Sequence, residues 1–539
     1  MQDLIGCATL RPLMQTVELL ILLLICLAGF GLLARKLQIP DPIVLVLGGL
    51  AVSLVPGLPP VELRPDYVFL IVLPPLLYAQ AWFTSWKDFC DNLRPITMLA
   101  VGLVLFTTTA VAFVAHALVP ELPLAAAFVL GAIVSPPDAV AAAAIAQRLR
   151  LPKQMVTILE GESLVNDATG LVAYKFALAA VATGSFSVAK ASGGFVIVAI
   201  GGIGVGLLAG WIFAALLCWI RDDLIDVVIS LLVPYIAYLS AERLHVSGVL
   251  ATVTAGIWIG ARSPNLLSAT TRLTAAAFWN TLVFVLNGVV FMLIGLQLPS
   301  VIQNLHDHSW TELLAVAALI GGTVIVTRLL WVFPGAWLPR WLSARIRARD
   351  PMPPWQNIAI VGWCGMRGVV SLAAALAVPH VLPNGNEFPE RDLILLFTFA
   401  VILITLVGQG LSLPALIRKL GVATHHTEDH LEREARRAAA QAALTRIEQV
   451  AAGDGLTAEA VNAVASAYHE RLHHLGDELA EALGWSPHRQ RSIEGRRLRR
   501  EALAAERQHL IALHRQHRLS KELLHKLERE LDLEEARMG

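Results

Sequence analysis

The residues of this chain that could do chemistry gather in the segment LEGESLVNDATGLV, residues 159–172. On a helix, side chains four residues apart share a face, so Ser163 would lie with Asp167 and Glu162 with Asn166. A carboxylate beside a hydroxyl offers hard oxygen donors, which suit a small cation. We therefore predict that Asp167 and Ser163 bind a transported cation, and that Asp167 holds a proton when the cation is absent.

A second segment of interest, GAIVSPPDAV, places Pro136 and Pro137 directly before Asp138. Proline lacks a backbone donor and clashes with the preceding turn, so two prolines in a row should open a helix. The carbonyl groups that this frees need a partner, which a cation or water can supply. The segment predicts a broken helix with an acidic residue at the break.

A third segment, VGWCGMRGVV, surrounds Arg367 with glycines, of which Gly365 and Gly368 are the nearest, and predicts a second break. Two interrupted segments at matching positions of two inverted halves point to the midplane site of a transporter. Glycine and proline also occur in membrane helices as simple kinks or close-packing residues. The ionisable residue at each break favours the interpretation as a site.

Buried charges need partners, and Arg367 is the only cation within the two interrupted segments. We expect an ion pair between Glu162 and Arg367, which does not titrate because arginine stays protonated. Asp167 is then left to exchange a proton for a cation. Asp138 could titrate as well, or it could be held ionised by freed backbone amides.

Two further cations lie within apolar segments, Lys175 and Arg328. We interpret Lys175, two turns beyond Asp167, as a structural ion pair or a side chain that reaches toward the helix end. Arg328 has the same interpretation, because it lies near the end of its predicted span.

The elements that position these residues follow from the composition. Of the 539 residues, 56% are hydrophobic and only 16% are charged, which a set of soluble domains does not match. The formal net charge is zero, so nothing points to nucleic acid, and the isolated cysteines indicate no zinc site and no cofactor. We predict an all-α polytopic membrane domain, residues 1–420, followed by a charged helical tail, residues 421–539.

A helix needs roughly 20 apolar residues to cross a membrane. Thirteen spans are predicted on this basis, at residues 17–34, 41–56, 66–84, 95–118, 122–147, 154–183, 192–220, 223–241, 246–262, 271–299, 311–334, 355–381 and 391–415. The interrupted spans are the fifth and the twelfth, and their odd offset predicts inverted repeats formed by spans 1–6 and 8–13. Lysine and arginine concentrate in the loops of one side, which places the N-terminus outside and the tail in the cytoplasm.

The motifs GESLVND and GMRG, with the stretches at 247–260 and 291–298, resemble the monovalent cation:proton antiporters, in the NhaP-type and sodium/proton exchanger branch. The resemblance covers residues 17–415. It implies a homodimer in the cell membrane, with interface spans within 17–84 and 192–299, core spans within 95–183 and 311–415, and elevator-type alternating access.

Site roles follow from the same resemblance. Asp167 resembles the carboxylate that binds ion or proton, Ser163 a neighbouring ligand, and Asn166 the asparagine that marks electroneutral exchangers. Asp138 resembles the aspartate at the crossing of the broken helices. Many members carry a hydroxyl residue before that aspartate, whereas Pro137 stands here, so that Ser135 or a backbone carbonyl could substitute as a ligand.

The implied function is exchange of Na⁺ for H⁺, with one cation per proton, and K⁺ or Li⁺ remain open as the cation. A cation channel is an alternative, but no selectivity filter or pore ring is visible. A membrane enzyme is a weaker alternative, because no catalytic motif occurs. The arginines clustered at 489–500 of the tail predict a solvated helix face or, alternatively, contact with anionic membrane lipid.

Overall fold

A computed structural model of the chain describes residues 2–55, 65–138, 151–185, 188–220, 222–303, 309–382, 385–422 and 427–453, with single residues between 142 and 149 and between 461 and 472. The chain divides into two compact units, Met1–Ala423 and Thr424–Gly539. Each unit is described by itself.

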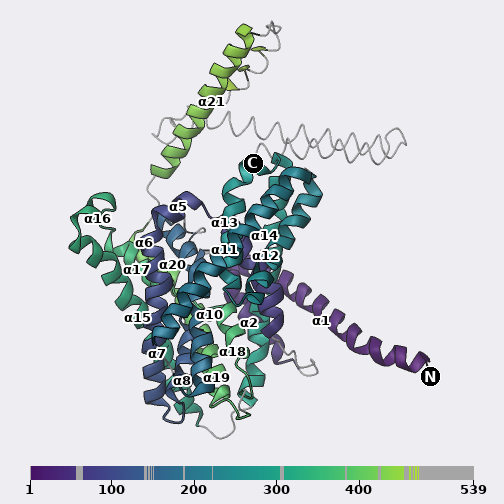
Figure 1. The fold of residues 1–539 in the computed structure, drawn as a ribbon, viewed down its shortest axis with the longest axis vertical. Helices are drawn as coiled ribbons and strands as arrows, with labels where there is room; N and C mark the ends of the chain where they lie inside the picture. The colour runs from purple at the N-terminus through teal and green to yellow at the C-terminus, as the bar shows by residue number, and fades with distance from the viewer. Residues whose placement is uncertain are drawn as a thin grey trace. The chain divides into compact units, whose positions relative to one another are not determined.

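The first unit is a helical bundle (Figure 1). Its helices up to residue 220 are α1 Gln2–Leu37, α2 Asp41–Ser53, α3 Pro65–Tyr67, α4 Leu73–Phe83, α5 Trp86–Asp91, α6 Leu93–Thr97, α7 Val104–Leu118, α8 Leu124–Val134, α10 Lys153–Thr183 and α11 Val188–Ile220. The later ones are α12 Asp223–Arg243, α13 Gly248–Leu266, α14 Ala269–Gln303, α15 Trp310–Leu342, α16 Ala344–Arg349, α17 Trp355–Trp363, α18 Val369–Leu376, α19 Arg391–Leu403 and α20 Gly410–Leu420.

Three short π-helical segments join consecutive helices without a turn: η1 Val68–Val72, η2 Met98–Leu103 and η3 Ile404–Gln409. Within the described residues, the β structure is limited to one antiparallel bridge between Val381 and Glu387.

Eight helical segments in the described residues are long and apolar enough to cross a membrane. They are Pro65–Phe83, Leu93–Leu118, Lys153–Thr183, Ala191–Ile220, Asp223–Arg243, Thr270–Pro299, Trp310–Leu342 and Arg391–Leu420. The apolar helices α2 and α8 are shorter. The expected all-helical, multi-span architecture is therefore present, and each of these eight segments overlaps a predicted span.

The helix that carries the GESLVND motif, α10, has clear start and stop signals. Pro152 stands directly before its first residue, where a missing backbone donor costs nothing. Gly184 follows its last residue in the left-handed conformation, with φ of 65°, and donates its N–H to the Ala180 carbonyl at 2.9 Å. Glycine adopts this conformation without strain, which makes it a common helix stop.

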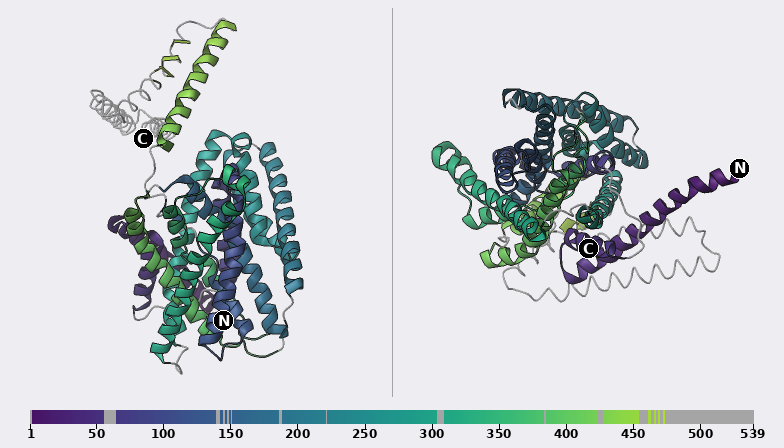
Figure 2. Two further views of the ribbon diagram at one scale, coloured as in Figure 1. Left: turned by 90° about the vertical axis from the view of Figure 1, so that its left-hand side faces the viewer. Right: turned by 90° about the horizontal axis from the view of Figure 1, so that it is seen from below.

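Small residues bring the helices of the bundle close together. α2 packs against α14, and a Cβ atom added at Gly49 would collide with the Met292 carbonyl of α14. Close backbone approach through small residues is the usual packing mode of membrane helices. One large apolar core joins α8, α10, α15 and α17–α19, while a second core joins α4 with α11–α14. Figure 2 shows the helices of the first unit from two further directions.

Within the described residues, the second unit begins with α21, Thr427–Gly453, a polar helix. The arginine cluster predicted at 489–500 lies outside the described residues.

Candidate ion-binding site

The side chains of the GESLVND motif are buried in the middle of α10. Glu162, Ser163, Asn166 and Asp167 are each at most 7% exposed. Because α10 packs against α8 on one side and α13 on another, its polar face has protein rather than solvent around it. Four polar residues in such surroundings require partners, and the first interruption supplies one of them, the Pro137 carbonyl that Asn166 binds.

Both predicted interruptions coincide with ends of helices. α8 ends at Val134, and residues 135–138 after it are not helical. α17 ends at Trp363 and α18 begins at Val369, so the five residues 364–368 between them are not helical. The two segments touch, because the Asp138 backbone N–H donates to the Met366 carbonyl at 2.7 Å.

The side chain of Arg367 caps the C-terminal end of α8. Its Nε donates to the Val134 carbonyl at 2.8 Å and one terminal nitrogen donates to the Ser135 carbonyl at 3.2 Å. The other terminal nitrogen bonds to the Gly365 carbonyl of its own segment. The last carbonyls of a helix carry partial negative charge, so a guanidinium is a suitable cap. The backbone N–H of Arg367 donates to Thr405 Oγ1 at 3.1 Å.

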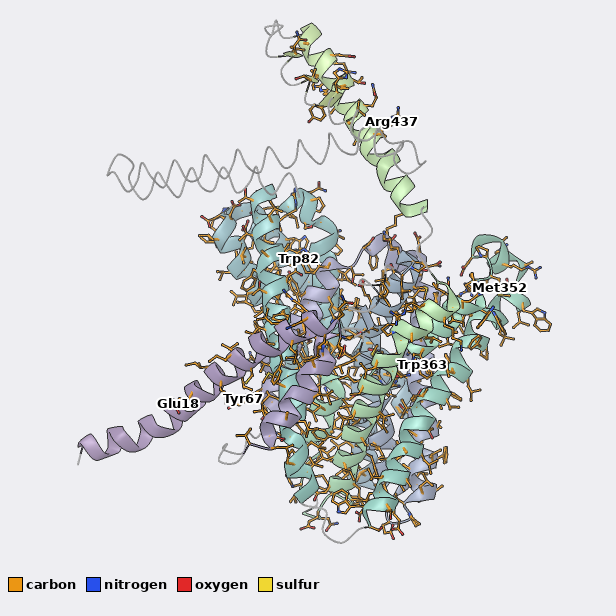
Figure 3. The ribbon with its side chains drawn as sticks, turned by 180° about the vertical axis from the view of Figure 1, so that it is seen from behind. Glu18, Tyr67, Trp82, Met352, Trp363 and Arg437 are labelled. Atoms are coloured by element: carbon orange, nitrogen blue, oxygen red, sulfur yellow. The ribbon has the colours of Figure 1, made fainter. Side chains whose placement is uncertain are left out.

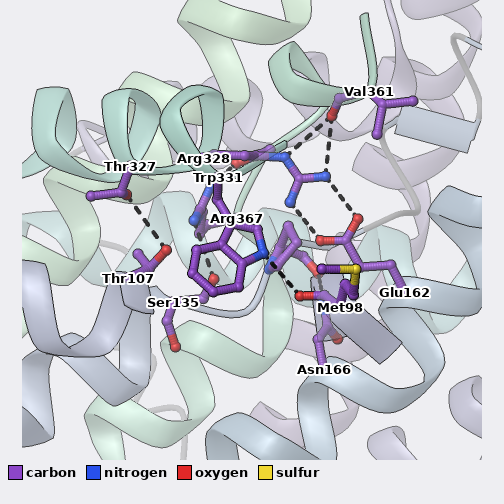
Figure 4. Close-up of polar contacts among 12 residues, drawn as sticks. Met98, Thr107, Ser135, Glu162, Asn166, Thr327, Arg328, Trp331, Val361 and Arg367 are labelled. Atoms are coloured by element: carbon purple, nitrogen blue, oxygen red, sulfur yellow. Dashed lines mark hydrogen bonds and ion pairs between the residues drawn. The ribbon is translucent and has the colours of Figure 1, made fainter. Parts of the chain in front are cut away.

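The expected ion pair between Glu162 and Arg367 is wrong. Glu162 pairs instead with Arg328, through two parallel bonds of 2.5 and 2.7 Å between the guanidinium and the two carboxylate oxygens (Figure 4). Both side chains are essentially inaccessible, at 0% and 1% exposure. Arg328 also donates to the Val361 carbonyl, at 3.3 Å from Nε and 3.2 Å from a terminal nitrogen.

The physical reason lies in the length of α15. The predicted span ended at 334 and placed Arg328 near a helix end, whereas α15 continues to Leu342 and holds Arg328 in its middle. The Oγ1 atoms of Thr107 and Thr327, 3.5 Å apart, tie α15 to α7 beside the pair (Figure 4). Arg328 therefore reaches Glu162, while Arg367 satisfies backbone carbonyls.

Asn166 holds the first interruption in place. Its amide nitrogen donates to the Pro137 carbonyl at 2.8 Å, and its carbonyl oxygen is buried without a partner among the described residues. Ser135, considered above as a substitute ligand, donates to the Ala132 carbonyl at 3.3 Å and accepts from Thr108 at 3.0 Å. The expected roles of Asn166 and Ser135 as direct ligands thus compete with structural bonds that both residues make.

A cavity of about 30 Å³ lies beside the polar face of α10. Asp138, Ser163 and Asp167 line it together with Pro136 and Gly368. This volume suffices for a water-sized guest, since about 10–15 Å³ is the minimum. The Asp167 side chain is 7% exposed, and no hydrogen bond or ion pair to it is present in the part of the chain that the structure describes.

The position of Asp138 is set by the start of α18. Gly368 is the residue before that helix, and a Cβ atom added there would collide with the Asp138 carboxylate. The carboxylate therefore lies directly against the end of α18 where backbone N–H groups are unpaired and the helix dipole favours negative charge.

Three polar lining residues were not singled out from the sequence: Gln80 on α4, Asn287 on α14 and Ser371 on α18. Ser371 had a usable signal, because it is a lone hydroxyl one turn after Gly368. Asn287 and Gln80 are isolated amides in apolar spans, and only the packing of α4 and α14 brings them to the cavity. The Asn287 carbonyl oxygen is buried without a partner among the described residues.

Lys175 makes an ion pair with Glu242 of α12 at 3.1 Å, with the two side chains 60% and 36% exposed. This agrees with its interpretation as a structural pair. Among the described residues, no group of three or more His, Cys, Asp or Glu side chains could hold a resident metal ion.

Comparison with known proteins places the chain in a family. The family model described as sodium/hydrogen exchanger, transmembrane, matches residues 20–419. An uncharacterized Na⁺/H⁺ exchanger of Mycobacterium tuberculosis is 35% identical over 443 residues, 81% of each chain. A sodium, potassium, lithium and rubidium/H⁺ antiporter of Bacillus pumilus is 35% identical over 410 residues, 74% of this chain and 61% of that one.

Among solved structures, the sodium proton antiporter MjNhaP1 from Methanocaldococcus jannaschii has the same fold. The TM-score is 0.60 at 22% identity, covering 76% of this chain and 99% of that one. The protein is therefore a multi-pass membrane transporter and not an enzyme, and it belongs to the sodium/hydrogen exchanger family.

Proposed function

We propose that this protein exchanges Na⁺ for H⁺ across the cell membrane, one for one, with Asp167 carrying either ion. The observation that carries the proposal is the cavity of about 30 Å³ in which Asp167 faces Ser163 and Asp138. A carboxylate and a hydroxyl around a water-sized space are hard oxygen ligands for a small cation. When the cation leaves, a proton neutralises the same carboxylate.

Charge accounting supports a cycle without net charge movement. Arg328 and Glu162 neutralise each other, and Arg367 is held by helix carbonyls. Asp138 lies against the start of α18, where it can stay ionised throughout. Only Asp167 then changes its state, and the moving site carries the same charge with either ion. The two ions compete, so the apparent cation KM should rise as pH falls.

The architecture that we propose has thirteen spans in two inverted repeats, with the broken fifth and twelfth spans crossing at the site. The contact between residues 135–138 and 364–368 supports the crossing. We further propose a homodimer that uses spans within 17–84 and 192–299, with the N-terminus outside and the tail in the cytoplasm. The other helices would move the site across the membrane by alternating access.

Exchange of K⁺ is the second candidate for the cation. The name of the Bacillus pumilus relative includes potassium, lithium and rubidium beside sodium. A site with few fixed ligands around one carboxylate is compatible with more than one monovalent cation.

The decisive variant is Asp167→Asn, assayed in proteoliposomes by cation-induced dissipation of a pH gradient. We expect the variant to fold and to show no exchange with Na⁺, Li⁺ or K⁺. Asp226→Asn is the matched control, because Asp226 is a buried aspartate of α12 outside the cavity. Exchange near the wild-type rate in Asp167→Asn would end the proposal.

Electroneutrality has its own test. A potassium-diffusion potential is imposed on proteoliposomes with valinomycin, and sodium is the substrate. Neither the rate of exchange nor its end point should depend on the imposed voltage. If either follows the voltage, a second charge moves, and Asp138 is the first residue to replace.

A further inference from the structure

A larger cavity, of about 450 Å³, lies between α5, α6, α15, α17 and the start of α10. It shares no lining residue with the cavity around Asp167. Arg94 belongs to the first turn of the apolar segment Leu93–Leu118, and Arg340 to the last turn of α15. The cavity therefore lies where apolar helices begin and end, at the depth of the membrane–water border.

Two arginines meet at one carboxylate in this cavity. Arg94 and Arg340 each donate a terminal N–H to Asp350 Oδ2 at 2.8 Å. Arg340 is almost fully buried and makes further bonds, to the Ala336 carbonyl at 2.6 Å and to the Asp350 carbonyl at 3.2 Å. Asp350 can offset only one of the two positive charges.

Arg94 retains most of its donors. A guanidinium has five N–H groups, and within the described residues the bond to Asp350 is the one that Arg94 makes. Its side chain is 29% exposed, so the remaining donors are accessible from the cavity. These donors match a phosphate group, which arginine binds through two parallel hydrogen bonds.

The cavity also has a negative group without a partner among the described residues. Asp91, at the end of α5, lines the same cavity and is exposed, and no ion pair to it is present among the described residues. Because the two arginines share Asp350, the cavity keeps one uncompensated positive charge, which the remaining donors of Arg94 can direct to a ligand, and one negative group, Asp91. Its lining charges sum to zero, which suits a ligand that carries both signs.

Apart from the amides of Asn92, Gln154 and Asn357, the rest of the lining is apolar. Met98, Leu99, Trp331 and Ile358 form walls between the charged groups. Near them on α15, Trp337 and Trp341 are 42% and 73% exposed, and tryptophan is enriched at membrane–water borders. Met352, also a lining residue, lies at the periphery of the bundle (Figure 3).

We propose that this cavity binds a phospholipid whose headgroup carries a phosphate and a primary ammonium, as phosphatidylethanolamine does. Arg94 binds the phosphate, Asp91 accepts hydrogen bonds from the ammonium, and the apolar walls contact the start of the acyl chains. A purely anionic headgroup would leave Asp91 unpaired and repelled. A choline headgroup has no N–H to donate to Asp91.

The test is lipid binding to the purified full-length protein, with the dissociation constant of the first bound lipid measured by native mass spectrometry. Palmitoyl-oleoyl phosphatidylethanolamine should bind more tightly than the matching phosphatidylcholine and phosphatidylglycerol. Soluble O-phosphoethanolamine, assayed by thermal stabilisation, should have no comparable effect. If it stabilises as well as the lipid does, the ligand is a soluble phosphate compound and the proposal fails.

Two variants separate the two ends of the headgroup. Arg94→Gln should weaken phosphatidylethanolamine and phosphatidylglycerol alike, by about fivefold for one basic group at a lipid surface. Arg94→Lys should retain most of the affinity. Asp91→Asn should weaken phosphatidylethanolamine alone, by a similar factor. Arg418→Gln, an exposed arginine at the end of α20 outside the cavity, is the matched control and should change nothing.

Equal affinity of the Asp91→Asn protein and the wild type for phosphatidylethanolamine would overturn the assignment of the ammonium site. Tighter binding of phosphatidylglycerol than of phosphatidylethanolamine to the wild type would overturn it as well. Unchanged binding of every lipid by Arg94→Gln would overturn the cavity as a lipid site.

Discussion

Breaking the pair between Glu162 and Arg328 should cost far more stability than removing the pair as a whole. Glu162→Gln leaves a guanidinium with 0% exposure and no negative partner, since the amide keeps only one of the two oxygen acceptors and carries no charge. Arg328→Met leaves a carboxylate that is 1% exposed. Removing one partner of a buried ion pair typically costs about 3–5 kcal/mol, because the other charge stays buried.

The double variant Glu162→Gln/Arg328→Met removes both charges. If the two losses were independent, they would sum to about 6–10 kcal/mol, whereas replacing both partners by neutral groups is often close to neutral. We therefore expect a coupling free energy of at least about 3 kcal/mol, at the upper end for contacting residues. The measurement is the free energy of unfolding in detergent, followed by tryptophan fluorescence during SDS titration.

Two further double-mutant cycles serve as controls. The exposed pair of Lys175 and Glu242 should give a coupling below about 1 kcal/mol, as surface pairs do. The cycle of Glu162 with Arg367 should give clearly less coupling than the cycle with Arg328, because no bond joins Glu162 to Arg367 in the structure. Additive losses for Glu162 and Arg328, or stronger coupling to Arg367, would refute the assignment of the pair.

Two other predictions concern single positions. Gly368→Ala places a Cβ atom on the Asp138 carboxylate and should destabilise the protein by about 1–3 kcal/mol while lowering exchange; Gly322→Ala, with no atom within 4 Å of the added carbon, should match wild type in both assays. At the bundle surface, a hydrogen bond from Lys153 holds the pKa of Asp88 below its ordinary value of 3.8. The resulting stability is present above pH 3.8 and is lost as pH falls through the lowered pKa. The small difference in melting temperature between wild type and Lys153→Gln should therefore be measurable at pH 7 and vanish in strong acid.

The ends of α8 and α17 lie where the sequence predicts a break, because the cause is local. Two prolines remove backbone donors wherever they stand, and the helical segment α8 does end directly before Ser135. The cluster on α10 could be located for the same reason, since residues four apart share a face of any helix. Asp138, Ser163 and Asp167 were chosen on these grounds and share one cavity.

The partner of Glu162 could not be chosen from local patterns. Its selection between Arg328 and Arg367 depends on where α15 ends and on how α15 lies against α7 and α10, which are contacts between distant segments. Asn287 and Gln80 were not predicted because they reach the cavity from α14 and α4, which are distant in sequence from α10.

The bond between the Asp138 N–H and the Met366 carbonyl joins the two interruptions through main-chain atoms alone. Any residue except proline can supply that N–H, and any residue can supply that carbonyl. The chemistry of the side chain at 138 and the joint that holds it are thus separable. Replacing the Asp138 carboxylate by an amide of the same shape would alter the charge beside Asp167 and leave the joint intact. The charge that a proton or cation meets at Asp167 can therefore change by substitution at this position without rebuilding the scaffold that carries it.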